Sequence, residues 1–286
     1  MKISKTDSRY PHLLLTIKDP PNPLYVYGSL DDISFKNCIA VVGSRNMSPY
    51  GAALIDKFIN ELSLYDCSVV SGFTRGVDRY AHKISIKNRV PTVAVLPFGV
   101  DETLLAADNF LTTICSNSGN IISEYPAEFK ATKWSFVRRN RIIAGMSLAT
   151  IVIEASENSG SLITANLAHK YSRPVFVIPG NIFSSLHKGI YQLIKSYAIP
   201  VASGSEIGEY LALTPKRSTH FTNKELATLT KNEENVMSTI RAAPLDAEHL
   251  HLYTSIDKTE LLPLLLSLQH KGYIYIKEGR YYVKES

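Results

Sequence analysis

The amino-acid sequence predicts an α/β fold, in which a parallel sheet carries helices on both faces. Short apolar segments alternate with helical patterns from Cys38 to Val201, as is typical of such sheets. The segment Ala149–Ile153 is β-branched and lacks polar alternation, which indicates a central strand buried on both faces. The chain has 286 residues, of which 45% are apolar and 20% charged, enough for one large domain and a small one.

Residues 1–36 are expected to form a lead-in segment and not a domain of their own. Its prolines, Pro11, Pro20, Pro21 and Pro23, favour extended or turn geometry. Within it, Leu24–Tyr27 is expected to pair as an edge strand of the main sheet.

Residues 37–213 are expected to form the main domain. Strands are predicted at Cys38–Val42, Cys67–Val70, Thr92–Leu96, Asn120–Ser123, Ala149–Glu154, Val175–Ile178 and Ile199–Val201. Helices are predicted near Pro49–Leu64, Val77–Ile86, Asn109–Ser116 and Leu186–Lys195, with two more that start around Arg138 and at Ser159–Ser161. Binding sites of such sheets lie beyond the carboxyl ends of the strands, so the residues there are the candidates for function.

The turn Ser159-Gly160-Ser161 follows the central strand and opens a helix that Leu162, Thr164 and Ala165 continue. The first backbone N–H groups of a helix have no partner within it, and small side chains let an anion approach them. The sequence therefore predicts a phosphate-binding corner here, in which we include Thr164.

The first strand of the main domain ends in Gly43-Ser44-Arg45-Asn46. Gly43 allows a tight turn, and the guanidinium of Arg45 suits phosphate oxygens. The spacing is neither a dinucleotide-binding pattern nor a P-loop, so no cofactor is predicted. The alternative for Arg45 is a structural role, as a helix cap or in an ion pair.

The next strand ends in a turn framed by Gly72 and Gly76, where Arg75 adds positive charge on the same side as Gly43. Asp78 is interpreted as a helix cap or loop anchor. His82 has no cysteine or second histidine at ligand spacing, so no metal site is predicted.

Cations then alternate with aromatic residues between positions 130 and 141: Lys130, Lys133, Trp134, Phe136, Arg138, Arg139 and Arg141. This combination suits single-stranded nucleic acid, because cations follow the backbone and an aromatic ring stacks on a base. The alternative is that the aromatic rings face the core and the cations form a solvated helix start.

The segments VVGSRN, SGFTRGVD..AH, F..RNRIIAGMS, IEASENSGSLITANLA and VFVIPGN, in this order, resemble the DprA (Smf) family of bacterial DNA-processing proteins. The resemblance covers about Tyr10 to Val201, and departures such as Ser172-Arg173 mark a divergent member. It implies an extended Rossmann-like fold that binds single-stranded DNA, forms a homodimer and loads the recombinase RecA onto incoming DNA in natural transformation. By position, it implies a DNA-binding pocket formed by Arg45, Lys133, Phe136, Arg139, Asn140, Arg141 and Ser159-Gly160-Ser161.

Residues 214–231 lose the alternation and are expected to be a polar linker. Residues 232–286 are expected to form three helices and a β-hairpin, which resemble a winged-helix domain. The helices are predicted at Asn232–Ala242, Ala247–Thr254 and Lys258–Lys271, and the strands at Tyr273–Lys277 and Tyr281–Lys284. The third helix is mostly leucine, so sequence-specific reading of a duplex is not expected.

Three function classes remain open on the sequence. The leading one is a non-enzymatic single-stranded DNA binder without catalytic residues. The second is a Rossmann-like nucleotide phosphoribohydrolase, for which Glu154 is the only nearby carboxylate. The third is a transcriptional regulator, which the leucine-rich third helix disfavours.

The net charge of +5 permits a polyanionic partner. No segment reads as a signal peptide or a membrane span, so we expect a cytoplasmic protein without a membrane partner. Cys38, Cys67 and Cys115 are expected to be free thiols.

Overall fold

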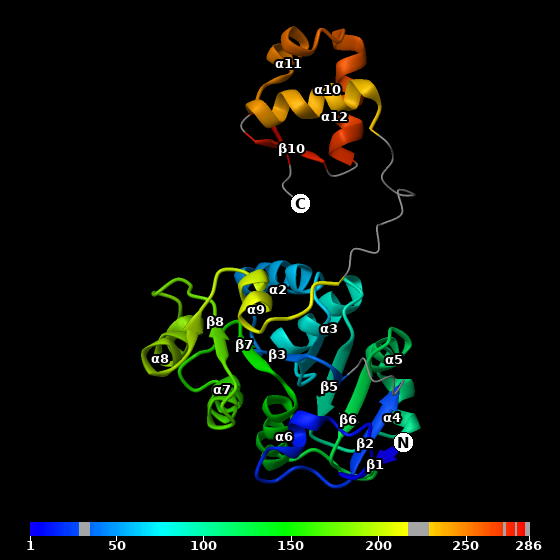
Figure 1. The fold of residues 1–286 in the computed structure, drawn as a ribbon, viewed down its shortest axis with the longest axis vertical. Coiled ribbons are helices and arrows are strands. Elements are labelled where there is room, and N and C mark those ends of the chain that lie inside the picture. The colour runs from blue at the N-terminus through cyan, green and yellow to red at the C-terminus, as the bar shows by residue number, and fades with distance from the viewer. Residues whose placement is uncertain (29–34, 217–228, 271–272, 278, 284–286) are drawn as a thin grey trace. The chain divides into compact units, whose positions relative to one another are not determined.

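The computed structural model describes residues 1–28, 35–216, 229–270, 273–277 and 279–283 (Figure 1). The chain divides into two compact units, 1–216 and 217–286, and each has a hydrophobic core of its own. Most of the predicted linker, residues 217–228 of 214–231, lies outside the described residues. The linker and the domain boundaries therefore stay predictions.

The larger unit is built on a sheet of nine described strands in the order β1-β2-β6-β5-β4-β3-β7-β8-β9. Strands β3 to β9 run parallel to one another, whereas β2 is antiparallel to both of its neighbours, β1 and β6. Their bounds are β1 Lys2–Ile3, β2 Leu24–Gly28, β3 Cys38–Val42, β4 Ser68–Ser71, β5 Thr92–Leu96, β6 Asn120–Ser123, β7 Ala149–Val152, β8 Val175–Val177 and β9 Ile199–Pro200. The predicted α/β class with a largely parallel sheet is confirmed.

The lead-in segment is an integral part of this unit. The strand predicted at Leu24–Tyr27 is not the edge of the sheet, because β1 pairs with its outer side. The amino group of Met1 also donates to the carbonyl of Val26 at 2.7 Å. Ile3 and Leu14 are buried in the main core, so apolar side chains attach the segment to the sheet.

Helices cover both faces of the sheet (Figure 1). Ala40 and Val42 of β3 share a core with one set of helices: α1 His12–Leu15, α6 Lys133–Met146, α7 Gly160–Lys170 and α8 Lys188–Ser196. Ile39 and Val41 point to the other face and share a core with α2 Pro49–Leu62, α3 Val77–Lys87 and α9 Gly204–Tyr210. Alternate residues of one buried strand thus serve opposite faces.

Short elements complete the larger unit. Helix α5 (Asn109–Ser116) packs on β5 and β6 as predicted. Helices α4 (Glu102–Ala107) and α9, the 3-10 helix η2 (Ser185–His187), helix α1 and strand β1 were not predicted from the sequence. They are too short for hydrophobic periodicity to reveal them.

The order of the strands reverses beside β3, because β4 lies on one side of it and β7 on the other. At such a reversal the loops after the two strands diverge and leave a crevice beyond their carboxyl ends. The segment after β3 and the segment after β7, more than 100 residues later in the sequence, are thereby brought to the same crevice.

The smaller unit has three described helices, α10 Lys231–Ala242, α11 Ala247–Thr254 and α12 Lys258–His270. An antiparallel pair follows, β10 Ile274–Lys277 with β11 Arg280–Val283. Its core is formed by Val236, Met237, Ile240, Leu250, Ile256, Leu261, Leu265, Leu268 and Ile274. These are the elements that the winged-helix prediction requires, and the winged-helix assignment itself stays a prediction. None of the described helices is both long and apolar enough to cross a membrane.

Candidate nucleic-acid interface

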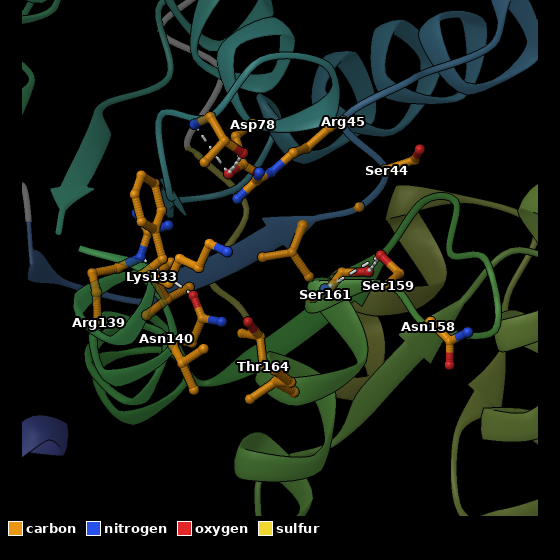
Figure 2. A pocket seen from close by; sticks show the side chains of 18 of the residues that line it. Ser44, Arg45, Asp78, Lys133, Arg139, Asn140, Asn158, Ser159, Ser161 and Thr164 are labelled. Carbon is orange, nitrogen blue, oxygen red and sulfur yellow. Dashed lines mark hydrogen bonds between the residues drawn. The ribbon is translucent and has the colours of Figure 1, made fainter. Parts of the chain in front are cut away.

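A cavity of about 730 Å³ lies in the crevice beside β3, between α6 and α7 (Figure 2). Twelve of the predicted site residues line it: Gly43, Ser44, Arg45, Asn46, Lys133, Phe136, Arg139, Asn140, Ser159, Gly160, Ser161 and Thr164. Three do not: Gly72 and Arg75 line a smaller cavity next to it, and Arg141 lines neither. Three segments that are distant in the sequence, 43–46, 133–140 and 159–164, therefore form one site.

Helix α6 forms one wall and begins earlier than predicted, at Lys133. The Thr132 side chain accepts from the backbone N–H of Ser135 at 3.1 Å, and the Ser135 hydroxyl accepts from that of Thr132 at 2.9 Å. This capping box satisfies backbone groups at the helix start, so Lys133 and Phe136 lie within the first turn. Lys133, Phe136 and Asn140 are three and four residues apart, which places them on one face of the helix.

Two exposed cations, Arg45 and Lys133, face the cavity without a carboxylate partner. Neither forms an ion pair with any carboxylate in the described part of the chain. The guanidinium carbon of Arg45 lies 5.5 Å from the centre of the Phe136 ring, within cation–π range. The wall therefore offers unneutralised positive charge beside an aromatic face.

Arg139 also lines the cavity, yet it is only 3% exposed. Its Nε donates to Oδ1 of Asn140 at 3.3 Å, and its other hydrogen bonds go to the sheet. Its Nη1 donates to the carbonyls of Gly72 and Val95, at the carboxyl ends of β4 and β5. A Cβ at Gly72 would lie 2.6 Å from Nη2 of Arg139, which explains the glycine there. Arg139 thus anchors α6 to the strand ends, a role that the sequence did not indicate.

The pKa of Arg139 reflects this burial. Burial lowers it to about 10, Asp78 raises it and Arg45 lowers it. The guanidinium remains protonated at neutral pH.

Arg141 lies on the side of α6 opposite Arg139, because two residues advance a helix by about 200°. Its Nη2 donates to Oε2 of Glu124 at 2.5 Å, and its side chain is 10% exposed. The structure thus does not place Arg141 at the cavity, where the prediction had put it. The partner that neutralises it, Glu124, lies in the turn after β6.

The start of α7 forms the opposite wall, across the cavity from Lys133 and Asn140 (Figure 2). Ser159 caps the helix: its hydroxyl oxygen accepts from the backbone N–H of Ser161 at 3.4 Å and lies 2.8 Å from the Ser161 hydroxyl. A Cβ at Gly160 would meet no atom within 4 Å. The predicted corner is therefore open, with small side chains around the positive end of the helix dipole.

Asp78 is the only carboxylate among the described residues that line the cavity. Its Oδ2 accepts from the hydroxyl of Thr74 at 2.6 Å and from the backbone N–H of Thr74 at 3.3 Å. Burial raises the pKa of Asp78, while Arg139 and the Thr74 hydrogen bonds lower it. These contacts agree with its interpretation as a loop anchor.

Glu154 is fully buried at the end of β7, and it is not among the cavity-lining residues. Its Oε2 accepts from the backbone N–H of Ser48 at 2.9 Å, and its Oε1 accepts from the Ser48 hydroxyl. Both oxygens thus hold the start of α2. The site can bind an anion, but it lacks a pair of carboxylates for acid–base chemistry.

The smaller cavity, of about 320 Å³, shares Arg45, Thr74 and Phe136 with the first. The rest of its lining is Gly72, Phe73, Arg75, Leu96, Pro97 and Phe98. Sequence reasoning missed Phe73 and Phe98. Their position directly after β4 and β5 was the available signal.

The remaining chemically reactive side chains are accounted for by packing. No group of three or more His, Cys, Asp or Glu within the described ranges is placed to hold a metal ion. None of the three cysteines forms a disulfide in the described part of the chain, and Cys38 and Cys67 are buried. His82 is buried with Nδ1 2.7 Å from the Thr92 hydroxyl, and burial lowers its pKa to about 3.

Comparisons with known proteins identify the family of this chain. Residues 2–212 match the family described as DNA recombination-mediator protein A. DNA processing protein DprA of Bacillus subtilis is 34% identical over 217 residues, which cover 76% of this chain and 72% of that protein. DprA of Streptococcus pneumoniae is 39% identical over 201 residues, or 70% and 71% of the two chains.

Solved structures show the same relationship. The crystal structure of Streptococcus pneumoniae DprA matches with a TM-score of 0.67 and 38% identity over 72% of each chain. DprA of Helicobacter pylori, whose structure describes a single-stranded DNA binding mode, matches with a TM-score of 0.64 and 27% identity over 74% of this chain and 96% of that one. This chain belongs to the DprA family of DNA recombination-mediator proteins.

Proposed function

We propose that the protein binds single-stranded DNA at the larger cavity and acts as a recombination mediator in DNA processing. The observation that carries this proposal is the pair of unneutralised cations, Arg45 and Lys133, beside the ring of Phe136 and opposite the open start of α7. The single-stranded DNA binding described for the Helicobacter pylori relative supports the same ligand.

Each part of the site suits one part of a DNA strand. Cations and helix-start N–H groups bind phosphate oxygens, and an aromatic ring stacks on a base of any sequence. Affinity is therefore expected to be salt-sensitive and tolerant of sequence, since phosphate contacts release counterions.

The test is fluorescence anisotropy with a labelled oligothymidine at two salt concentrations, and with a duplex of equal length for comparison. Arg45→Glu reverses a charge at the cavity. Lys170→Glu is the matched control, because Lys170 is exposed at the far end of α7, roughly 15 Å from its start. We expect the first variant to lose binding and the second to retain it. Equal affinity of Arg45→Glu and wild type, with the fold intact, contradicts the site.

We further propose that the protein forms a homodimer and loads RecA onto incoming single strands in natural transformation. This step rests on membership of the family. Its test is RecA filament formation on single-stranded DNA, followed with and without the protein, and with Arg45→Glu. RecA filament formation that the wild-type protein accelerates and Arg45→Glu does not accelerate supports this step. Analytical ultracentrifugation measures the oligomeric state.

The phosphoribohydrolase alternative gains no support from the carboxylates. Asp78 anchors Thr74, and both oxygens of Glu154 bond Ser48. Release of free base from nucleoside monophosphates would restore that alternative.

A further inference from the structure

We propose that the smaller cavity, between Phe73, Phe98 and Phe136, receives a nucleobase of the strand whose phosphates lie in the larger cavity. The inference rests on the proposed function, because the base arrives with the bound strand. Its volume of about 320 Å³ is at the lower end of the usual range for ligand pockets, about 300 to 1,000 Å³.

The chemistry of the lining suits a flat apolar group that carries negative charge. Leu96, Pro97 and the three phenylalanines form apolar and aromatic walls, and Arg45 and Arg75 are the charged residues of the lining. Both arginines are exposed, and Arg75 Nη2 donates to Oδ1 of Asn46 at 2.8 Å. A base joined to phosphates has both properties, since its rings stack on aromatic faces and its phosphates attract the arginines.

The two cavities are also connected through shared residues. Arg45, Thr74 and Phe136 line both, and Asn46, which holds Arg75, lines the larger one. A nucleotide with its phosphate near Arg45 therefore has the aromatic cavity directly beside it.

The backbone of Phe73 is strained, which points to a function. Its φ is 62°, a left-handed conformation that is rare for a bulky residue and is often found at functional sites. The ring is held by Arg79, whose guanidinium carbon lies 4.4 Å from its centre, and by Phe110, stacked at 5.7 Å. Phe73 thus places an aromatic side chain at a backbone position that glycine would adopt without strain.

The backbone around Phe98 is held by hydrogen bonds within the protein. The hydroxyl of Ser123 donates to the carbonyl of Phe98 at 2.7 Å, and the N–H of Gly99 donates to the carbonyl of Phe129 at 2.9 Å. A wall that is already in place loses little conformational entropy on binding. The backbone that carries each of the two rings is thus in place before binding.

The test separates base binding from phosphate binding with two probes. One is an oligothymidine, and the other is an abasic deoxyribose-phosphate oligomer of the same length, both measured by anisotropy at low salt. Phe98→Ala should weaken binding of the oligothymidine about 5- to 100-fold, the effect of losing a base–aromatic stack. It should leave binding of the abasic oligomer unchanged.

Two further variants complete the design. Phe98→Leu keeps the apolar volume and removes the aromatic face, so it should fall between wild type and Phe98→Ala. Phe183→Ala is the matched control, because its ring is 90% exposed and lines neither cavity.

The outcomes distinguish the two proposals. If Arg45→Glu abolishes binding of the oligothymidine and Phe98→Ala leaves it unchanged, the base site alone is overturned. Equal weakening of both probes by Phe98→Ala also overturns it, because the substitution then acts through the fold. Failure of wild type to bind either probe overturns the proposed function itself.

Discussion

The two sides of helix α6 carry similar residues and do different things. On the cavity side, Lys133 is exposed and has no carboxylate partner among the described residues. On the other side, Arg138 and Arg141 both bond Oε2 of Glu124, at 3.1 and 2.5 Å. The difference teaches that a run of cations in the sequence does not mark a DNA-binding surface by itself. What matters is which cations the fold leaves unneutralised.

The largest effect is expected from removing Glu124, the carboxylate that neutralises Arg138 and Arg141. Glu124→Ala leaves the buried Arg141 with only the exposed carboxylate of Asp19, 3.6 Å away. Breaking a buried pair costs about 3 to 5 kcal/mol of the free energy of unfolding. The side chains of Glu124 and Arg141 are 8% and 10% exposed, so water compensates little. Urea unfolding measures the loss. Stability equal to that of wild type means that the pair is not a structural contact.

A matched pair of substitutions on α6 tests the comparison directly. Lys133→Gln should weaken binding of single-stranded DNA about 10- to 150-fold, because a charge-assisted contact is worth about 1.5 to 3 kcal/mol. The slope of log affinity against log salt should fall by about 0.7, the value for one phosphate contact. Arg138→Gln should change affinity and slope little, since its charge is already paired. Equal losses in the two variants contradict the distinction between the faces.

Gly160→Ala sharpens the assignment of the opposite wall. The added methyl group meets no protein atom within 4 Å, so the free energy of unfolding should not fall. The methyl group should obstruct a phosphate at the helix start and weaken binding about fivefold, as for one lost hydrogen bond of about 1 kcal/mol. Anisotropy and urea unfolding of the same preparation check both. A variant with full affinity argues that the strand does not approach this corner.

The smallest effect is expected at Asp19, an exposed carboxylate that contacts both Arg138 and Arg141. Its carboxylate lies 3.2 Å from Arg138 and 3.6 Å from Arg141, and its side chain is 62% exposed. Asp19→Ala should cost less than about 1 kcal/mol, because exposed ion pairs contribute little. Urea unfolding beside Glu124→Ala makes the comparison. A loss as large as that of Glu124→Ala would show that exposure does not decide the value of these pairs.

Local sequence patterns predicted much of the fold and part of the site. The β-branched segment at Ala149–Ile153 indicated a buried strand, and the structure has β7 there. Ser159-Gly160-Ser161 indicated a helix start, and α7 begins at Gly160. Both depend on interactions within a few residues, so the sequence contains them directly.

Arg139 and Arg141 show what local sequence patterns did not predict. They stand two residues apart in the same helix, yet Arg139 bonds Gly72 and Val95, and Arg141 bonds Glu124. These partners come from β4, β5 and the turn after β6. Phe73 and Phe98, which line the smaller cavity, lie on two separate strand ends for the same reason.

The sequence alone determined the order of the main-domain strands and longer helices, the class of the sheet, and the helix start at Gly160, because propensity and hydrophobic periodicity act locally. Only the tertiary structure decided which cations stay free and which aromatic rings share a cavity. The physical reason is that neutralisation and stacking belong to pairs of side chains. Such a pair forms only when the folded sheet places both side chains at the same edge.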